Sequence, residues 1–540
     1  MNQLTKSEYL VNFLTSNGTT HIFGYPGGYI TRFTDALYQN KKIKTHLCYH
    51  EQACAFATCA YARLTGNVGV YFTTSGPGVI NGLAGLADAY FDGVPLLAIG
   101  GNVNTFEMKG NRPIRQLGFQ EMDAVSVCKP VTKKAVSATS ADNFAELLED
   151  LWQTALSDRC GPVFLDFPFD VQKEIIDFVP RGNSPDKSTE KYQDEKILNL
   201  IKSAKRPIVI AGSGVRTAGA VAEIRKIAAK IPTVTSMNAV DLIADKRHKI
   251  GFIGAYGSRL ANTLLSQSDV VISVGARLDT RQTGMMPKDA TLIRVDIDGG
   301  ELSLEKPNQT SVQADAKLFL NFLLESDVES DFSDVRKLQE KFSGFDRELG
   351  NLFMEEIGKY ILPNSVITTD VGQNQVWTAQ SLHPTGDDSR ILIGGGYGSM
   401  GCSLPYAIAG GLVSGSPVYC IAGDGGVQMN IQELQTVVRE GLAVKIFVFN
   451  NSSLGMIRVF QTELFEERFA YTVNSGGYIE PDFCAVARGY GIKSARITVP
   501  ADFAKYAEWF RDGDACLFDV ALGEGTSLMP KILFGKHGYA

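Results

Sequence analysis

Short runs of apolar residues alternate along this chain with stretches in which apolar residues recur at helical spacing. Because the short runs are apolar throughout, both faces of each predicted strand should be covered, as in parallel sheets packed between helices. The pattern therefore predicts an α/β fold of three doubly wound parallel-sheet domains. The runs lie at 68–74, 95–101 and 161–167 in the first third, at 206–214 and 269–276 in the middle, and at 416–426 and 444–451 in the last third.

Two polar stretches divide the chain. Pro180–Lys196 and Glu325–Asp346 are rich in charged residues and poor in apolar periodicity, which places domain boundaries near 185 and 335. The expected domains cover residues 1–180, 190–330 and 350–540, and the first and third could share one architecture. The opening 14 residues follow helical spacing and predict a first helix rather than a secretion signal.

Composition narrows the class of protein. Of 540 residues, 44% are hydrophobic and 21% charged, as in an average globular chain, and the net charge of −7 comes without a long basic run. We therefore expect neither a nucleic-acid partner nor a membrane partner, and a cytoplasmic location. The nine cysteines contain no Cys-x-x-Cys pair, so we expect reduced core thiols rather than disulfides or a zinc site.

The sharpest chemical signal lies where two apolar runs of the last third end. Gly423-Asp424-Gly425 follows one run, and Asn450-Asn451 ends the next. Neighbouring parallel strands would bring Asp424 and Asn451 together at the carboxyl edge of a sheet, where open α/β sheets bind ligands. Their oxygens suit a magnesium ion that holds a diphosphate, and the glycines allow close approach of the backbone. Gly-Asp-Gly alone would be equally compatible with a plain strand-to-helix turn.

This arrangement resembles the diphosphate-binding motif of thiamine diphosphate enzymes, and other segments extend the resemblance. The catalytic subunit of acetolactate synthase (acetohydroxyacid synthase) is the family that matches over nearly the whole chain. The resemblance implies a pyrimidine-binding first domain, a central domain and a diphosphate-binding third domain. The matching segments include FGYPGGYI at 23–30, YHEQACAFATCAYARLTG at 49–66, TSGPGVINGLAGLADAYFDGVPLL at 74–97, GFQEMD at 118–123, IGAYGSRLAN at 253–262, GARLDTRQTG at 275–284, VGQNQVW at 371–377, GGGYGSMGCSLPYAIAG at 394–410 and GDGGVQMNIQEL at 423–434.

The resemblance also implies roles for individual residues. Glu51 would bond a ring nitrogen of the cofactor's pyrimidine, and Met400 would hold its two rings folded together. Phe119, Gln120, Lys133 and Arg281 would serve the substrate pocket. The other implied ligands of thiamine diphosphate are Pro26, Gly28, Asn81, Gln373, Asn374, Gly398, Gly425, Gly426, Gly455 and Met456, and those of magnesium are Asp424, Asn451 and Ser453.

A second cofactor, FAD, is implied in the central domain, where acetolactate synthases bind it. Ser213, Ser236 and Tyr256 argue against FAD, because relatives more often carry Gly, Thr and His there. The glycine run AGSGVRTAG is by itself a weak signal for a phosphate site. The residues implied in flavin binding are Gly212, Gly214, Ser236, Met237, Gly254, Gly275, Arg277, Asp279, Asp296, Ile297, Glu301 and Asp315.

Relatives build each active centre from two chains, because the glutamate lies in the first domain and the metal site in the third. The resemblance therefore implies a homodimer or homotetramer, and it leaves open a regulatory subunit. A dehydrogenase is excluded because no GxGxxG follows a first strand with an acidic residue about 20 residues later. A non-catalytic paralogue is disfavoured because Glu51, Asp424 and Asn451 occur together.

The predicted activity is decarboxylation of a 2-oxo acid such as pyruvate and transfer of the two-carbon unit to a second carbonyl compound, such as another 2-oxo acid. Tyr29, Thr280 and Phe460 depart from the family pattern around the acceptor. Phe460 replaces a tryptophan, and the smaller ring would admit a larger acceptor such as an activated keto sugar. A simple 2-oxo acid decarboxylase and a flavin-dependent oxidase on the same scaffold remain alternatives.

Overall fold

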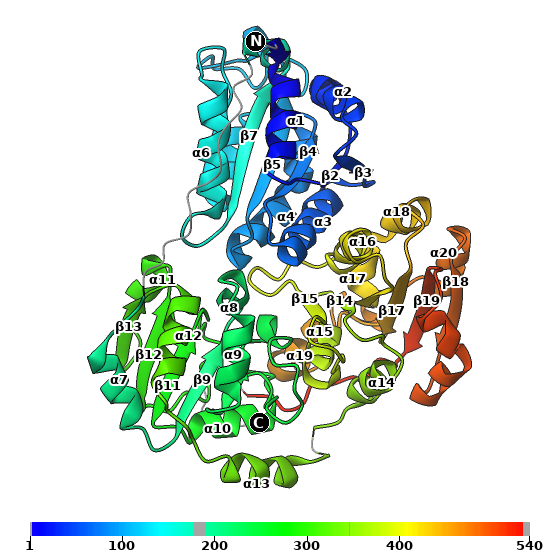
Figure 1. Ribbon diagram of the computed structural model, residues 1–540. Coiled ribbons are helices and arrows are strands. Elements are labelled where there is room, and N and C mark those ends of the chain that lie inside the picture. Colours follow the sequence, from blue (N-terminus) through cyan, green and yellow to red (C-terminus); the bar gives the residue numbers. More distant parts are fainter. Residues whose placement is uncertain (1–2, 178–190, 345, 533–540) are drawn as a thin grey trace.

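The protein is described by a computed structural model that covers residues 3–177, 191–344 and 346–532. Figure 1 shows three bodies, each with a sheet between helices: the first in blue to cyan, the central in green and the third in yellow to red. The three sheets are parallel throughout, which confirms the predicted fold class. Every predicted strand run coincides with an observed strand, and the central strands are buried on both faces.

The first domain has a six-stranded sheet of order β3-β2-β4-β5-β7-β6. A short strand, β1 (Gln3–Thr5), pairs antiparallel with β8 (Ile175–Asp177). The predicted first helix begins only at Lys6, because Thr5 and Glu8 form a capping box that stops it from extending further back. The strands are β2 (His21–Gly24), β3 (Lys44–Leu47), β4 (Gly69–Thr73), β5 (Leu96–Asn102), β6 (Lys134–Ser137) and β7 (Pro162–Pro168), and the helices are α1 (Lys6–Ser16), α2 (Thr31–Gln39), α3 (Glu51–Thr65), α4 (Pro77–Asp92), α5 (Ala124–Cys128) and α6 (Phe144–Leu156).

The central domain has a five-stranded sheet of order β10-β9-β11-β12-β13. Its strands are β9 (Pro207–Ala211), β10 (Thr233–Thr235), β11 (Val270–Val274), β12 (Thr291–Asp296) and β13 (Gln309–Gln313). Its helices are α7 (Glu195–Lys202), α8 (Gly214–Thr217), α9 (Val221–Ala228), α10 (Arg259–Ser266), α11 (Gly299–Ser303) and α12 (Ala316–Glu325), followed by α13 (Ser333–Phe342).

The third domain repeats the plan of the first. Its sheet has the order β15-β14-β16-β17-β19-β18, which is the first domain's order when strands are counted along the chain. The expectation that the two domains share an architecture is therefore confirmed. The strands are β14 (Val366–Thr369), β15 (Arg390–Ile393), β16 (Val418–Gly423), β17 (Val444–Asn450), β18 (Lys493–Ile497) and β19 (Cys516–Ala521), and the helices are α14 (Leu349–Gly358), α15 (Gln373–Ser381), α16 (Ser403–Ser414), α17 (Asp424–Gln428), α18 (Leu434–Arg439), α19 (Gly455–Leu464) and α20 (Phe483–Gly489).

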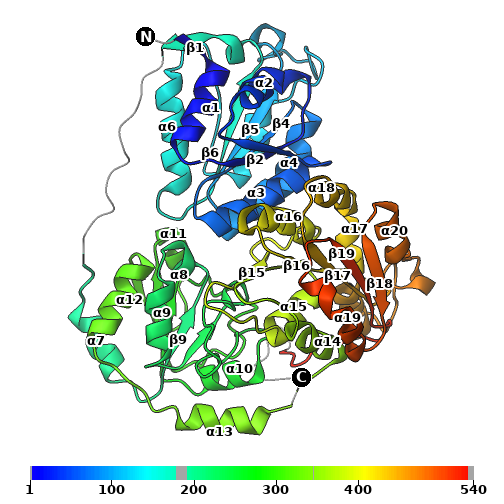
Figure 2. The same ribbon diagram turned by 45° about the vertical axis from the view of Figure 1, so that its right-hand side comes forward.

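The first and third domains share one hydrophobic core across α3 and α16, which face each other in Figure 2. Phe56 meets Tyr406 edge to face with ring centroids 6.2 Å apart, and the Tyr406 hydroxyl donates to Asp88 Oδ2 over 3.0 Å. Arg63 Nη1 donates to the Ile393 carbonyl over 2.8 Å. These contacts join the first and third domains.

The domain boundaries stay predictions. The boundary near 185 lies outside the described residues, and the one near 335 falls within α13. All nine cysteines are free thiols, and eight are buried. Across residues 3–177, 191–344 and 346–532, every helix is too short or too polar to cross a lipid bilayer.

Candidate active site

Asp424 and Asn451 lie side by side at the carboxyl edge of the third domain's sheet. Asp424 begins α17 directly after β16, and Asn451 follows β17, the strand that pairs in parallel with β16. Asp424 Oδ2 accepts a hydrogen bond from the Ser453 amide over 3.1 Å, and Asn451 Oδ1 accepts from the same amide over 3.2 Å. The two side-chain oxygens therefore converge on one point.

The side chains that supply these oxygens are buried. Asp424 is only 3% exposed, and burial raises the pKa of its carboxyl to about 7. The Ser453 hydroxyl is buried, and within the described residues it has no hydrogen-bond partner. A divalent cation would offset the cost of burying this carboxylate and would engage the hydroxyl. The donor set is carboxylate, amide and hydroxyl oxygen, which is the chemistry that magnesium prefers.

Glycines let the backbone after Asp424 pack closely against neighbouring side chains. A Cβ on Gly425 would lie 2.6 Å from Leu454 Cδ2, and one on Gly426 would lie 2.8 Å from Asp370 Cγ. The Met400 side chain reaches the same place, because its Cε lies 3.5 Å from the position of a Gly425 Cβ. Gly398 has a left-handed φ of 84°, which a residue with a side chain adopts at a cost.

Asp370, at the end of β14, holds the loop that carries Met400. Its Oδ1 accepts from the Gly401 amide over 2.8 Å, and its Oδ2 accepts from the Ser403 hydroxyl over 3.0 Å. Burial raises the pKa of this carboxyl to about 6. Sequence reasoning missed Asp370, although a carboxylate at the end of an apolar run next to VGQNQVW was a usable signal.

Gln373 and Asn451 are joined in a network that sequence reasoning also missed. Asn451 Nδ2 donates to Gln373 Oε1 and to Thr526 Oγ1, both over 2.9 Å, and the Thr526 hydroxyl lies 2.7 Å from Gln373 Oε1. Asn374 is buried and bonds the Asp370 carbonyl over 2.8 Å. A Cβ on Gly455 would meet Gln373 Oε1 at 2.5 Å, so this glycine is required by close approach. Met456 and Phe460 follow it on α19, both half-buried.

Glu51 is the first residue of α3, at the carboxyl edge of the first domain's sheet. It is buried, and Asn81 on α4 donates from Nδ2 to its Oε2 over 3.0 Å. A Cβ on Gly78 would lie 3.2 Å from Glu51 Oε1, so the Gly76-Pro77-Gly78 turn packs on the carboxylate. Pro26 and Gly28 follow β2 at the same sheet edge and are exposed. The structure thus brings together Glu51 and Asn81.

Two residues predicted to line the substrate pocket lie on the loop beside the Gly76-Pro77-Gly78 turn. Gln120 has a φ of 64°, and its carbonyl would lie 2.7 Å from a Cβ on Gly76. Phe119 is 75% exposed. Lys133 lies elsewhere: it precedes β6 at the amino end of the sheet, where its Nζ donates to the Ser157 carbonyl over 2.6 Å. Within one chain, Lys133 and Glu51 are therefore at opposite edges of the sheet.

In the central domain, backbone packing explains the glycines that suggested a phosphate loop. A Cβ on Gly212 would lie 1.9 Å from the Gly275 carbonyl oxygen, and one on Gly214 would lie 2.8 Å from Gly275 Cα. Gly275 has a left-handed φ of 59°. Tight packing of the turn after β9 on the turn after β11 therefore requires these glycines, whatever the domain binds.

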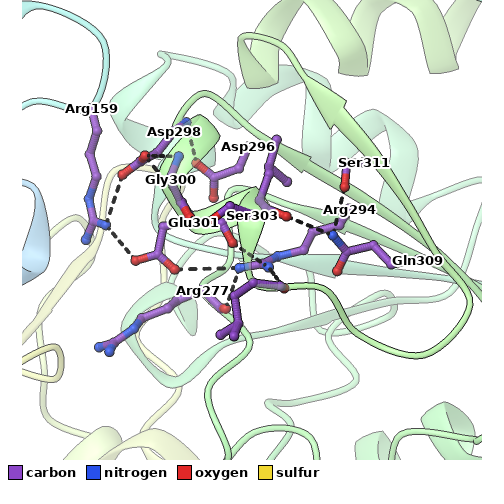
Figure 3. Close-up of polar contacts among 12 residues, drawn as sticks. Arg159, Arg277, Arg294, Asp296, Asp298, Gly300, Glu301, Ser303, Gln309 and Ser311 are labelled. Carbon is purple, nitrogen blue, oxygen red and sulfur yellow. Dashed lines mark hydrogen bonds and ion pairs between the residues drawn. The ribbon is translucent and has the colours of Figure 1, made fainter.

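Several residues expected to line a flavin take part in a polar network (Figure 3). Glu301 pairs with Arg159 of the first domain over 3.1 Å and with the fully buried Arg294 over 3.6 Å. Arg294 also donates to the carbonyls of Glu301 and Arg277, over 2.8 and 3.0 Å. These contacts join the first and central domains.

The other residues expected to bind a flavin either make local hydrogen bonds or are described by their exposure and backbone conformation. Asp279 accepts from the Arg281 amide over 2.9 Å, Asp296 from the Asp298 amide over 3.0 Å and Asp315 from the Lys317 amide over 2.8 Å. Gly254 has a φ of 116°. Arg281 and Ile297 are exposed, Ser236 is buried, and Met237 is partly buried against the third domain's core.

Within the part of the chain that the structure describes, no group of three or more His, Cys, Asp or Glu side chains could hold a metal ion. The candidate metal site around Asp424 contains only one such side chain, and its other oxygens come from Asn451 and Ser453. A metal ion held there would have oxygen ligands only, a donor set that suits magnesium better than a transition metal.

Comparison with known proteins agrees with this geometry. Residues 4–127, 195–323 and 370–520 match the N-terminal TPP binding domain, the central domain and the C-terminal TPP binding domain of thiamine pyrophosphate enzymes. The chain is 32% identical to the acetolactate synthase large subunit of Lactococcus lactis over 98% of this chain and 95% of that one. It is 33% identical to that of Corynebacterium glutamicum over 99% and 89%, and 32% identical to isozyme 2 of Escherichia coli over 91% and 90%. The chain therefore belongs to the thiamine pyrophosphate enzymes of the acetolactate synthase type and is a thiamine diphosphate-dependent carboligase.

Proposed function

We propose that this enzyme uses magnesium with thiamine diphosphate to decarboxylate a 2-oxo acid, pyruvate in the first instance, and to transfer the two-carbon unit to a second carbonyl compound. The observation that carries the proposal is the convergence of Asp424 Oδ2 and Asn451 Oδ1, both on buried side chains, on the Ser453 amide. Those oxygens and the Ser453 hydroxyl would hold magnesium, and magnesium would hold the diphosphate.

When bound, thiamine diphosphate supplies a nucleophilic carbon and a sink for the electrons released by decarboxylation. Glu51 would share a proton with a ring nitrogen of the pyrimidine, and its burial would strengthen that hydrogen bond. Asn81 orients the carboxylate by donating to Oε2. Met400 would pack between the rings, and Asp370 keeps its loop in place.

We further propose that two chains build each centre, as a homodimer or homotetramer. Apolar side chains are exposed beside both halves of the site, among them Phe106 and Phe119 on the first domain and Tyr397 on the third, at 75%, 75% and 55%. A second copy would cover them. A regulatory subunit is also a proposal, supported by the relatives' names as large subunits.

The acceptor is proposed from residues around the pocket. A second 2-oxo acid such as pyruvate is the first candidate; a larger acceptor such as an activated keto sugar is the second, favoured by the half-buried Phe460 on α19 in place of tryptophan. Phe119, Gln120, Arg281 and Lys133 keep their proposed substrate roles, and Lys133 would have to act on a neighbouring chain's site. FAD stays a proposal with weaker support, because backbone packing and the Glu301 ion pairs account for the residues that suggested it.

One experiment tests the proposal. The purified full-length protein is incubated with thiamine diphosphate, magnesium and pyruvate, with and without candidate carbonyl acceptors, and products are identified by mass spectrometry. Acetolactate formation supports the first acceptor, and an adduct with an added keto sugar supports the second. Acetaldehyde alone indicates a decarboxylase, and bleaching of bound flavin by pyruvate without oxygen indicates an oxidase. Turnover that is unchanged by chelation of magnesium would refute the metal assignment.

A further inference from the structure

Thr526 lies beyond β19, far along the chain from the motifs of the site, yet its side chain is buried between two of them. Its hydroxyl lies 2.7 Å from Gln373 Oε1 and 2.9 Å from Asn451 Nδ2. Its carbonyl accepts from Arg458 Nη2 over 2.6 Å and from Gln373 Nε2 over 3.4 Å. From these contacts we propose that Thr526 is a positioning residue that turns the Asn451 amide so that its oxygen faces the metal. This inference rests on the proposed magnesium site.

The direction of each hydrogen bond follows from the inventory of donors. Gln373 Nε2 donates to the Thr526 carbonyl, so Gln373 Oε1 faces Asn451 and can only accept. The single hydrogen of the Thr526 hydroxyl therefore goes to Gln373 Oε1, and its oxygen accepts from Asn451 Nδ2. Both hydrogens of the Asn451 amide are then used, one by Gln373 and one by Thr526.

Only one orientation of Asn451 satisfies this network. If the amide were turned over, its oxygen would face the oxygen of Gln373, acceptor against acceptor. In the satisfied orientation, Asn451 Oδ1 points to the Ser453 amide, where Asp424 Oδ2 also arrives. Magnesium binds through oxygen, so the turned amide would offer it a nitrogen that cannot serve as a ligand.

A substitution at Thr526 can test the role of its hydroxyl separately from the role of its backbone carbonyl. Thr526→Val keeps the shape and the carbonyl that Arg458 holds, and it removes only the hydroxyl. Asn451 then has one unsatisfied buried hydrogen, and the preference for the ligating orientation weakens. Partners that orient metal ligands typically contribute roughly 10–100-fold to metal affinity. We expect the magnesium concentration that half-saturates cofactor binding to rise roughly tenfold or more.

The test measures thiamine diphosphate binding to the full-length protein by calorimetry while magnesium is varied from a chelated zero point. Thr526→Val and Thr526→Ala should both require roughly tenfold more magnesium, and Thr526→Ser, which keeps the hydroxyl, should behave as the wild type. Ser527→Ala is the matched control, because this neighbouring side chain lies outside the network. Thermal unfolding of each protein without magnesium or cofactor is measured alongside.

The outcomes separate this inference from the proposal on which it rests. If the wild type binds thiamine diphosphate independently of magnesium, the metal site itself is refuted. If the wild type needs magnesium and Thr526→Val needs no more of it, the positioning role is overturned. The role is also overturned if Thr526→Ser is as defective as Thr526→Val, or if the two hydroxyl-free variants differ from the wild type only in thermal stability.

Discussion

Gly455→Ala tests whether the amides of the site are held as rigidly as the structure indicates. Gly455 begins α19, and its backbone φ lies outside the left-handed range, so the backbone itself accepts alanine. Alanine is also the better helix former, by up to about 1 kcal/mol in a helix interior. The added Cβ, however, would lie 2.5 Å from Gln373 Oε1 and 2.6 Å from Asn451 Nδ2.

The magnitude depends on whether those two groups can move. Contacts below 3.0 Å require a shift of several tenths of an ångström, and both side chains are buried and bonded to each other and to Thr526. Overpacking of this kind costs about 1–3 kcal/mol, which exceeds the gain in helix propensity. We expect the folded state to lose about 1–2 kcal/mol. We also expect magnesium-dependent binding of thiamine diphosphate to fall sharply, because Asn451 is displaced.

Calorimetric titration of the cofactor and the thermal midpoint of the apo protein provide the readouts. Gly489→Ala is the matched control: Gly489 ends α20, and a Cβ there would have no heavy atom within 4 Å. That variant should bind the cofactor as the wild type does, with unchanged or slightly higher stability. Wild-type affinity and stability in Gly455→Ala would refute the view that Gln373 and Asn451 are locked in place.

Three other predictions address catalysis, pH dependence and specificity. Glu51→Gln should still bind thiamine diphosphate and lose roughly 100-fold or more in turnover of pyruvate, since an amide cannot share the pyrimidine proton; a wild-type rate would remove Glu51 from the mechanism. Burial raises the pKa of the Asp166 carboxyl from 3.8 to about 7, so the folded state binds the proton more tightly. The protonated Asp166 carboxyl therefore adds at most about 4 kcal/mol to the free energy of unfolding. This contribution is fully present below about pH 4 and is lost as the pH rises to 7. Asp166→Asn should flatten that slope in thermal midpoints measured from pH 5 to 8, and an unchanged slope would contradict the assignment. Phe460→Trp should lower reaction with bulky acceptors roughly tenfold or more relative to pyruvate, measured in competition in one tube; an unchanged product ratio would mean that Phe460 does not line the acceptor pocket.

Parts of the molecule could be predicted from local pattern alone. Apolar runs identified parallel strands because a strand covered on both faces is mostly apolar, and β16 and β17 lie where those runs are. Gly-Asp-Gly and Asn-Asn identified one sheet edge because neighbouring parallel strands end together. The start of α1 at Lys6 was not predicted, although Thr5 and Glu8 have the spacing of a capping box. The glycines at 212, 214 and 275 do not by themselves indicate a phosphate site, because packing of backbone on backbone needs the same residue type as a phosphate loop.

The sequence by itself determined the three α/β domains, the strand runs and the residue types that meet at the ends of β16 and β17, because these depend on neighbours in the chain. Tertiary structure alone decided that Thr526 orients Asn451, that Asp370 holds the Met400 loop and that Arg159 pairs with Glu301 across two domains. Those contacts join residues remote in sequence. The local sequence pattern around a threonine, aspartate or arginine does not reveal which distant residue it contacts. The direction of a buried hydrogen bond follows only from which donor faces which acceptor, and folding sets that.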